Sequence, residues 1–234
     1  MTSFQFRTVP HIVSAPGAAP ELARHAAPAL KGARRLLVVT DKGVMGLGLL
    51  NSALEGLKAD GFQVHVYDKV VADPPESVIE EAVTEGRGFG AEAVIGFGGG
   101  SPMDTAKVVA LLLGSEQPLA DMYGMDRVKG PRLPLILIPT TAGTGSEVTS
   151  VAVITTGATS KRGIAAAPLY ADMAVLDADL TLGLPKHITA ATGIDAMVHA
   201  IEAFTGKRFK NPVSDALALA ALKKLQGAIL TACD

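Results

Sequence analysis

The chain has 234 residues, of which 48% are hydrophobic and 19% are charged, and its formal net charge is −2. This length allows one large domain, or one and a half ordinary ones, with a sizeable core. The near-neutral charge and the lack of a strong basic cluster argue against nucleic acid as a partner. The longest unbroken apolar segment, residues 216–222, is too short to span a bilayer, so we expect a soluble protein with no membrane partner.

The cysteine content and the N-terminal segment suggest a compartment. A single cysteine, Cys233, excludes an internal disulfide and a metal site built from several cysteines. Residues 1–10 lack the apolar segment of a secretory signal. Both features predict a cytoplasmic protein.

Short β-branched segments alternate with longer segments of helical periodicity along most of the chain. The predicted strands are residues 35–40, 63–67, 93–97 and 135–138, and the predicted helices between them are residues 46–59, 76–88 and 102–113. This alternation predicts an α/β fold, a parallel sheet with helices on both faces. Two later apolar segments, residues 151–155 and 174–177, predict further strands, one of them in a hairpin or at an edge.

The pattern changes at Pro185. Beyond it, Ala, Leu and Ile recur with helical spacing over residues 190–204 and 212–230. Asn211 is a suitable N-cap, with Pro212 at the first helical position. We therefore predict an α/β domain over residues 1–185 and the beginning of an all-helical domain over residues 186–234.

A glycine-rich segment, residues 96–104 (GFGGGSPMD), follows a predicted strand and opens a helix. Glycines let the backbone approach a pyrophosphate closely, and the first turn of a helix presents free N–H groups. Part of the pattern has a structural explanation, since Ser101 as N-cap, Pro102 in the first position and Asp104 in the third resemble a capping box. The context favours phosphate binding over a plain turn, although the spacing differs from G-x-G-x-x-G.

Two further features follow predicted strands. Asp41 is placed where a carboxylate accepts hydrogen bonds from both ribose hydroxyls of an adenosine and repels a 2′-phosphate, which would favour NAD over NADP. The alternative, equally open from position alone, is that Asp41 caps the next helix. Residues 139–149 (PTTAGTGSEVT) form a hydroxyl-rich loop that suits a polar ligand or is only a turn. Ser146 lacks the pattern of a nucleophile elbow, which argues against a serine hydrolase.

Asp195 and His199 are four residues apart on a predicted helix and therefore project from one face. Together they can hold a divalent metal, although such a pair is more often a surface hydrogen bond. The flanking Ile194, Val198 and Ile201 predict a largely buried helix, which favours the metal site.

Four segments occur in the order and spacing of one known family. They are residues 98–107 (GGGSPMDTAK), 139–149, 177–185 (DADLTLGLP) and 192–204 (TGIDAMVHAIEAF). Over essentially its whole length the chain resembles the iron-containing (group III) alcohol dehydrogenases, which include lactaldehyde reductases and 1,3-propanediol dehydrogenases. The resemblance implies a Rossmann-like dinucleotide-binding domain followed by a helical domain, as in the dehydroquinate synthase architecture.

The resemblance also implies NAD as cofactor. It assigns twelve residues to cofactor binding: Asp41, Asp73, Gly98, Gly99, Gly100, Ser101, Asp104, Thr140, Thr141, Thr144, Val153 and Lys161. The glycines and Ser101 would hold the pyrophosphate, Asp41 the ribose and Lys161 the cofactor itself, with Asp104 towards the nicotinamide. The family usually has Asn at position 73, so Asp73 lacks an amide donor.

For the metal, the resemblance assigns the first two ligands to Asp195 and His199. In the family two more histidines, on later helices, complete the site, and none of this chain's other histidines matches them. A divalent metal, Fe(II) or else Zn, would act as a Lewis acid on a small primary alcohol or diol and its aldehyde. We expect this chain to be part of a longer protein and a homodimer or higher oligomer, and as it stands to bind metal weakly and to expose apolar helix faces.

Two alternatives remain open at this stage. One is an NAD-binding fragment that catalyses nothing because its metal site is incomplete. The other is a zinc-dependent polyol or glycerol dehydrogenase on the same fold.

Overall fold

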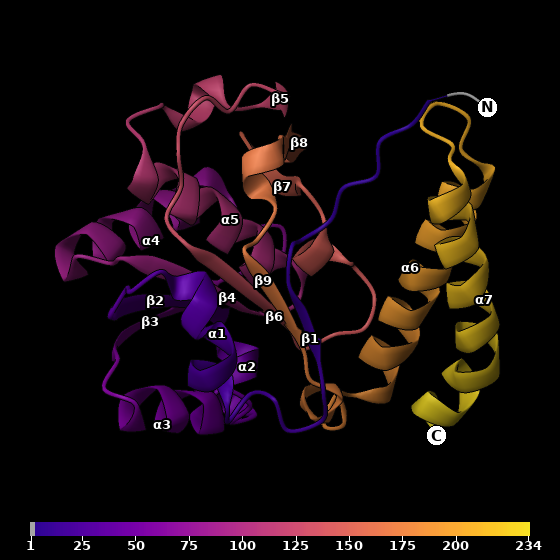
Figure 1. The fold of residues 1–234 in the computed structure, drawn as a ribbon, viewed down its shortest axis with the longest axis horizontal. Helices are drawn as coiled ribbons and strands as arrows, with labels where there is room; N and C mark the ends of the chain where they lie inside the picture. The colour runs from indigo at the N-terminus through magenta and orange to yellow at the C-terminus, as the bar shows by residue number, and fades with distance from the viewer. Residues whose placement is uncertain (1–2) are drawn as a thin grey trace.

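The computed structural model describes residues 3–234, in which an α/β body is followed by a pair of long helices (Figure 1). The main sheet has six strands in the order β1-β9-β6-β4-β2-β3, and neighbouring strands pair in parallel. In chain order these strands are β1 (Ile12–Ser14), β2 (Arg35–Asp41), β3 (Gln63–Val70), β4 (Ala93–Gly98), β6 (Leu135–Pro139) and β9 (Met173–Leu176). The predicted parallel α/β fold is confirmed.

Helices cover both faces of this sheet. Every residue of β4 is buried, and its alternate side chains enter two different clusters, with Val94 on one side and Ile95 on the other. Helices α4 (Glu76–Phe89) and α5 (Gly100–Gly114) contribute to the first cluster, and α1 (Leu22–Leu30) and α3 (Asn51–Ala59) to the second. A strand buried on both faces needs a continuous apolar sequence, which is why β4 and β6 were recognisable.

The N-terminal part of the body differs from the prediction. The helix predicted over residues 46–59 begins only at Asn51, as α3, and a short helix α2 (Lys42–Gly46) precedes it. Gly48 between them has a φ of +68°, a left-handed conformation that glycine adopts readily and that interrupts the helix. Strand β1 and helix α1 were not predicted. The predicted strand at 174–177 ends one residue earlier, since the Asp177 carboxylate accepts hydrogen bonds from the N–H groups of Gly17 and Ala19, both at 2.9 Å.

A smaller sheet has the strand order β5-β8-β7. Strands β7 (Val151–Thr156) and β8 (Ser160–Ala165) form an antiparallel hairpin, and β5 (Gly124–Met125) pairs with β8 in parallel. The strand predicted over residues 151–155 is confirmed, and it is the one of the two later strands that lies in a hairpin. Strands β5 and β8 were missed. Four short 3₁₀ helices complete the body: η1 (Leu119–Asp121), η2 (Ser146–Val148), η3 (Ala167–Leu169) and η4 (Ala178–Thr181).

The last two helices, α6 (Lys186–Thr205) and α7 (Pro212–Cys233), run side by side at one end of the body (Figure 1). Pro185 is the residue before α6, and Gly193 of α6 lies directly against Ile229 of α7. The Asn211 side chain accepts a hydrogen bond from the Ser214 N–H at 3.0 Å, so the predicted N-cap is confirmed. The division into two domains at residue 185 stays a prediction.

Both helices present apolar side chains to the outside. Ile194, Val198 and Ile201 are 54%, 45% and 49% exposed, so the prediction of a largely buried helix around Asp195 is wrong. The reason is that, among the described residues, α7 covers one side of α6 and little covers the rest. The expected exposed apolar faces are confirmed, with Leu217 57% and Leu230 76% exposed.

Within residues 3–234, helix α7 is the one helix that is long and apolar enough to cross a membrane. Its mean hydropathy is 1.4, and 6% of the apolar window is buried. A single such helix is weak support for a membrane span, because helices of many soluble proteins have the same length and composition.

The close packing at β4 predicts the effect of one substitution. A methyl group added at Gly96 would lie 2.7 Å from Leu137 Cδ2 and 2.8 Å from Ala106 Cβ. We expect Gly96→Ala to lower the free energy of unfolding by about 1–3 kcal/mol in urea denaturation, since the buried neighbours must move. Gly163→Ala on exposed β8, where an added methyl meets no atom within 4 Å, is the control and should change little. Equal unfolding midpoints for both variants would contradict this packing.

Candidate cofactor-binding site

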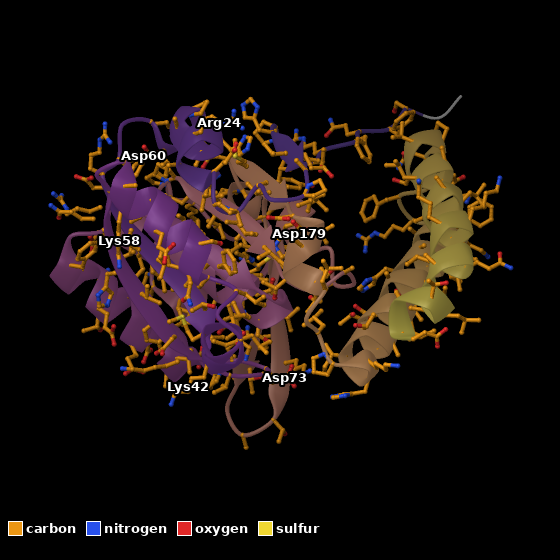
Figure 2. The ribbon with its side chains drawn as sticks, turned by 90° about the horizontal axis from the view of Figure 1, so that it is seen from below. Arg24, Lys42, Lys58, Asp60, Asp73 and Asp179 are labelled. Carbon is orange, nitrogen blue, oxygen red and sulfur yellow. The ribbon has the colours of Figure 1, made fainter. Side chains whose placement is uncertain are left out.

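A cleft of about 870 Å³ lies at the carboxyl ends of β2, β4 and β6, which are neighbours in the sheet. Its polar surface includes Asp41, Lys42, Lys69, Gly99, Gly100, Ser101, Thr140 and Thr141, and its apolar walls include Val44, Leu47, Leu49, Val70, Val71, Leu184 and Ile188. Figure 2 shows that Lys42 and Asp73, which follow β2 and β3, lie along the same edge of the body. Carboxyl ends of neighbouring parallel strands are where open α/β sheets bind ligands. The apolar walls were missed, because no pattern marks them in the sequence.

Backbone without side chains forms one side of the cleft. Gly98 has a φ of +147°, and a methyl group there would lie 2.8 Å from Pro102 Cγ and 3.4 Å from Asp41 Oδ2. Helix α5 begins at Gly100, and its N-cap Gly99 provides no side-chain hydrogen bond. The prediction of Ser101 as N-cap is therefore wrong, because the helix starts earlier than a capping box would place it. The first amides of α5 carry no side-chain cap, which suits an anionic ligand.

Asp41 was predicted either to contact the adenosine ribose or to cap the next helix, and the structure shows the cap. Its Oδ1 accepts a hydrogen bond from the Val44 N–H at 2.9 Å and so caps α2. Its Oδ2 faces the Gly98 position. A carboxylate has four acceptor sites, so the cap leaves capacity for a ribose hydroxyl. The ribose contact stays a prediction.

The loop over residues 139–149 packs against the glycine segment. The N–H of Thr140 donates to the Gly98 carbonyl at 3.0 Å, and a methyl group at Gly100 would lie 3.0 Å from Thr144 Cγ2. The Thr141 hydroxyl is buried and, within residues 3–234, has no hydrogen-bond partner. An unsatisfied buried hydroxyl costs about 1–3 kcal/mol. Thr141 lines the cleft, so a rotation of this side chain about χ1 would bring its hydroxyl to a polar ligand there.

The same loop reaches helix α6. A methyl group at Gly143 would lie 2.5 Å from the Thr192 carbonyl oxygen and 2.8 Å from Thr192 Cβ. Thr192 lies about one helical turn before Asp195. The loop thus connects the cleft to the helix that carries the predicted metal ligands.

Asp104 ties the start of α5 to the loop and to the hairpin. Its Oδ1 accepts a hydrogen bond from Ser146 Oγ at 2.6 Å, and its Oδ2 accepts one from the Val153 N–H at 2.9 Å. The resemblance assigned Asp104 and Val153 to the cofactor, and the structure shows that they contact each other. Asp104 therefore has a structural role that the sequence did not reveal.

Lys107, which no pattern in the sequence marks as a site residue, is fully buried beside Asp104. Its Nζ donates to Ser146 Oγ at 2.8 Å, to Thr149 Oγ1 at 3.2 Å and to the Val151 carbonyl at 2.7 Å. Burial lowers the pKa of Lys107 to about 8, although the nearby carboxylates of Asp104 and Glu147 oppose this shift. Burial also raises the pKa of Glu147.

Asp73 and Lys161 form an ion pair, with 2.6 Å between Lys161 Nζ and Asp73 Oδ1. The Asp73 carbonyl accepts a hydrogen bond from Thr155 Oγ1, so the segment after β3 is joined to the hairpin of β7 and β8. Both charged side chains are more than half exposed, so the pair contributes little to stability. The departure from the family's Asn at position 73 was the signal in the sequence, and the ion pair is its structural consequence.

Asp195 and His199 lie on one face of α6 as predicted, with 3.7 Å between Asp195 Oδ2 and His199 Nδ1. Their side chains are 44% and 53% exposed. No group of three or more His, Cys, Asp or Glu side chains suited to a metal occurs within residues 3–234. Catalytic zinc centres have three protein ligands, so two donors do not complete a site of this kind for zinc or iron. The described residues therefore do not fit a complete metal centre.

Comparison with known proteins identifies the family. Residues 10–178 match the iron-containing alcohol dehydrogenases, and residues 189–234 match the C-terminal part of the Fe-containing alcohol dehydrogenase family. The chain belongs to the iron-containing alcohol dehydrogenase family.

Individual relatives share both sequence and fold with this chain. A sulfoacetaldehyde reductase of Bilophila wadsworthia is 42% identical over 222 residues, which are 94% of this chain and 57% of the relative. The structure of an alcohol dehydrogenase from Oenococcus oeni superposes with a TM-score of 0.93 at 30% identity, covering 99% of this chain and 60% of that one. The structure of the sulfoacetaldehyde reductase of Bifidobacterium kashiwanohense in complex with NAD+ gives a TM-score of 0.88 at 29% identity. The match covers 100% of this chain and 62% of the reductase. The chain thus spans roughly three-fifths of the length of these proteins.

The unpartnered Thr141 hydroxyl leads to a test of the site. We expect Thr141→Val to leave the cofactor-free protein as stable as the wild type, or up to about 1 kcal/mol more stable, since it removes an unsatisfied buried hydroxyl. The same change should weaken NADH binding about tenfold. Thr105→Val on α5 is a matched control, because the Thr105 hydroxyl is also buried without a partner among the described residues but does not line the cleft. Urea denaturation and NADH fluorescence titration measure both effects, and NADH binding that is unchanged in Thr141→Val would contradict a cofactor contact.

Proposed function

We propose that this chain binds NAD in the cleft at the ends of β2, β4 and β6, as the dinucleotide-binding portion of a metal-dependent alcohol dehydrogenase. The observation that carries the proposal is the bare backbone at Gly98, Gly99 and Gly100, opposite the unpartnered hydroxyl of Thr141. Gly99 and Gly100 line the cleft, and Gly98 lies buried behind them. An added methyl group would collide with Pro102 at Gly98 and would crowd Thr144 at Gly100.

The chain's own residues would bind and orient the cofactor. Amides at the start of α5 bind the pyrophosphate, Asp41 accepts hydrogen bonds from the adenosine ribose, and the apolar walls exclude water. The nicotinamide ring supplies the hydride acceptor when NAD is bound. Lys161 and Val153 of the hairpin, with Asp73, border the far side of the cofactor in this proposal.

The charges around the cleft support NAD over NADP. Asp41 would repel a 2′-phosphate. Lys69, which also lines the cleft, is held by Glu81 at 2.6 Å and by Glu85 at 2.9 Å. Its charge is therefore compensated. Lys42, next to Asp41, also lines the cleft, so the preference for NAD rests on the Asp41 carboxylate.

The role of Asp41 can be tested without disturbing α2. Ser is about as good an N-cap as Asp, so Asp41→Ser should keep the helix while removing the carboxylate. We expect the preference for NADH over NADPH, measured as a ratio of dissociation constants by fluorescence titration, to fall about tenfold or more. An unchanged ratio would show that Asp41 is only a cap. Asp68→Ser, a change of the same kind on β3 at a carboxylate that does not line the cleft, is the control.

We further propose that the complete reaction interconverts a small primary alcohol or diol and its aldehyde. Support comes from the family and from relatives that are described as alcohol dehydrogenases and as a sulfoacetaldehyde reductase. A homodimer or higher oligomer, which the resemblance implies, and a cytoplasmic location, which the cysteine content and the N-terminal segment predict, stay proposals. The incomplete metal site favours a second candidate for this chain alone, NAD binding without turnover.

Metal loading distinguishes the two candidates. After anaerobic loading with Fe(II), or with Zn(II), we expect NADH binding but no detectable oxidation of ethanol or 1,2-propanediol, because the described residues offer two ligands. Metal-dependent turnover that disappears in His199→Ala would overturn this expectation and establish the dehydrogenase activity in this chain. His187→Ala, at the start of α6, is the matched control.

A further inference from the structure

Lys107 satisfies three oxygen atoms that belong to different segments. An ammonium group has three N–H donors, and here each has one acceptor, in Ser146, Thr149 and Val151. The Ser146 hydroxyl donates a hydrogen bond to Asp104, and Asp104 accepts a second one from the Val153 N–H. One buried cation thus fixes the end of the 139–149 loop and the first residues of β7 against α5.

Stability alone does not explain a lysine at this position. An ammonium group is costly to bury, and apolar residues of similar volume often replace buried ionic groups without loss of stability. The charged groups that face Lys107 among the described residues are Asp104, at 3.6 Å on α5, and Glu147 on η2, while β7 contributes a backbone carbonyl. Asp104 is also bonded to Ser146 and Val153, so the lysine is part of a network rather than of an isolated pair.

We propose that Lys107 is a positioning residue for cofactor binding, which holds the 139–149 loop and the start of β7 in the geometry that the cofactor requires. The inference rests on the proposed function, and it adds a residue that does not line the cleft. Lys107 acts through Ser146, Thr149 and Asp104.

The protonation state of Lys107 gives this proposal a specific signature. A neutral amine has two hydrogens, so one of its three acceptors loses its donor above the pKa of about 8. NADH affinity should therefore fall as the pH rises through this value. The free energy of unfolding should change with pH in the opposite direction. In the unfolded chain Lys107 has its ordinary pKa of 10.5, so between pH 8 and pH 10.5 the unfolded chain binds more protons than the folded protein. The contribution of Lys107 to stability therefore rises with pH over this range.

The experiment is an NADH fluorescence titration from about pH 6.5 to about pH 9.5, on either side of the Lys107 pKa, combined with urea denaturation. For the wild type we expect the dissociation constant to rise several-fold over the upper part of this range. For Lys107→Met we expect binding about tenfold weaker at neutral pH, no such pH dependence, and an unfolding midpoint that is equal or higher. Thr105→Val, a buried polar residue on the same helix, should retain the wild-type profile.

A second variant covers the case in which Lys107→Met fails to fold. Ser146→Ala removes the hydroxyl that Lys107 and Asp104 share but keeps the ammonium, and it should also weaken NADH binding. The positioning role would be overturned if Lys107→Met bound NADH with the affinity and pH profile of the wild type. It would also be overturned if Ser146→Ala bound NADH as tightly as the wild type. The same holds if Lys107→Met lowers stability but the folded protein binds normally. A wild type that binds no NADH at any pH would instead overturn the proposed function, and the positioning role with it.

Discussion

The close approach of three segments at the carboxyl end of β4 is the constraint on which the site depends. Where β4 ends and α5 begins, Gly98 and Gly100 leave little room for side chains, because Pro102 and Thr144 already lie against this backbone. The neighbouring strands contribute Asp41 on one side and Thr140 on the other, the latter through its hydrogen bond to Gly98. A parallel sheet with β4 between β2 and β6 is what brings these three segments together.

From this point the 139–149 loop extends the organisation outwards. Its first half packs on the glycine segment, Gly143 contacts α6 at Thr192, and its last residues are held by Lys107. Buried polar contacts thereby fix both ends of the loop, and the close contact of Gly143 with the backbone of α6 fixes its middle. A change in any of these contacts would be expected to alter the cleft and the position of α6 together.

Much of the fold and the main parts of the site could be predicted, because they follow from local patterns. Continuous apolar runs mark β4 and β6, and the glycine segment and Asp41 follow strands directly. The features that were missed depend on tertiary contacts. Strand β8 contains Lys161 and Arg162 and is recognisable only through its pairing with β7. A lysine on a helix is normally exposed, so the burial of Lys107 could not be inferred, and the ion pair of Asp73 with Lys161 joins segments far apart in the sequence.

The most direct test of this account is amide hydrogen exchange of the chain with and without saturating NADH, since it locates the cofactor without requiring turnover. The account predicts slower exchange at residues 98–104 and 139–149, where the start of α5 and the loop border the cleft, and little change over α7. Unchanged exchange at both segments, or protection confined to α6 and α7, would contradict the central claim that the bare backbone after β4 is the cofactor-binding site.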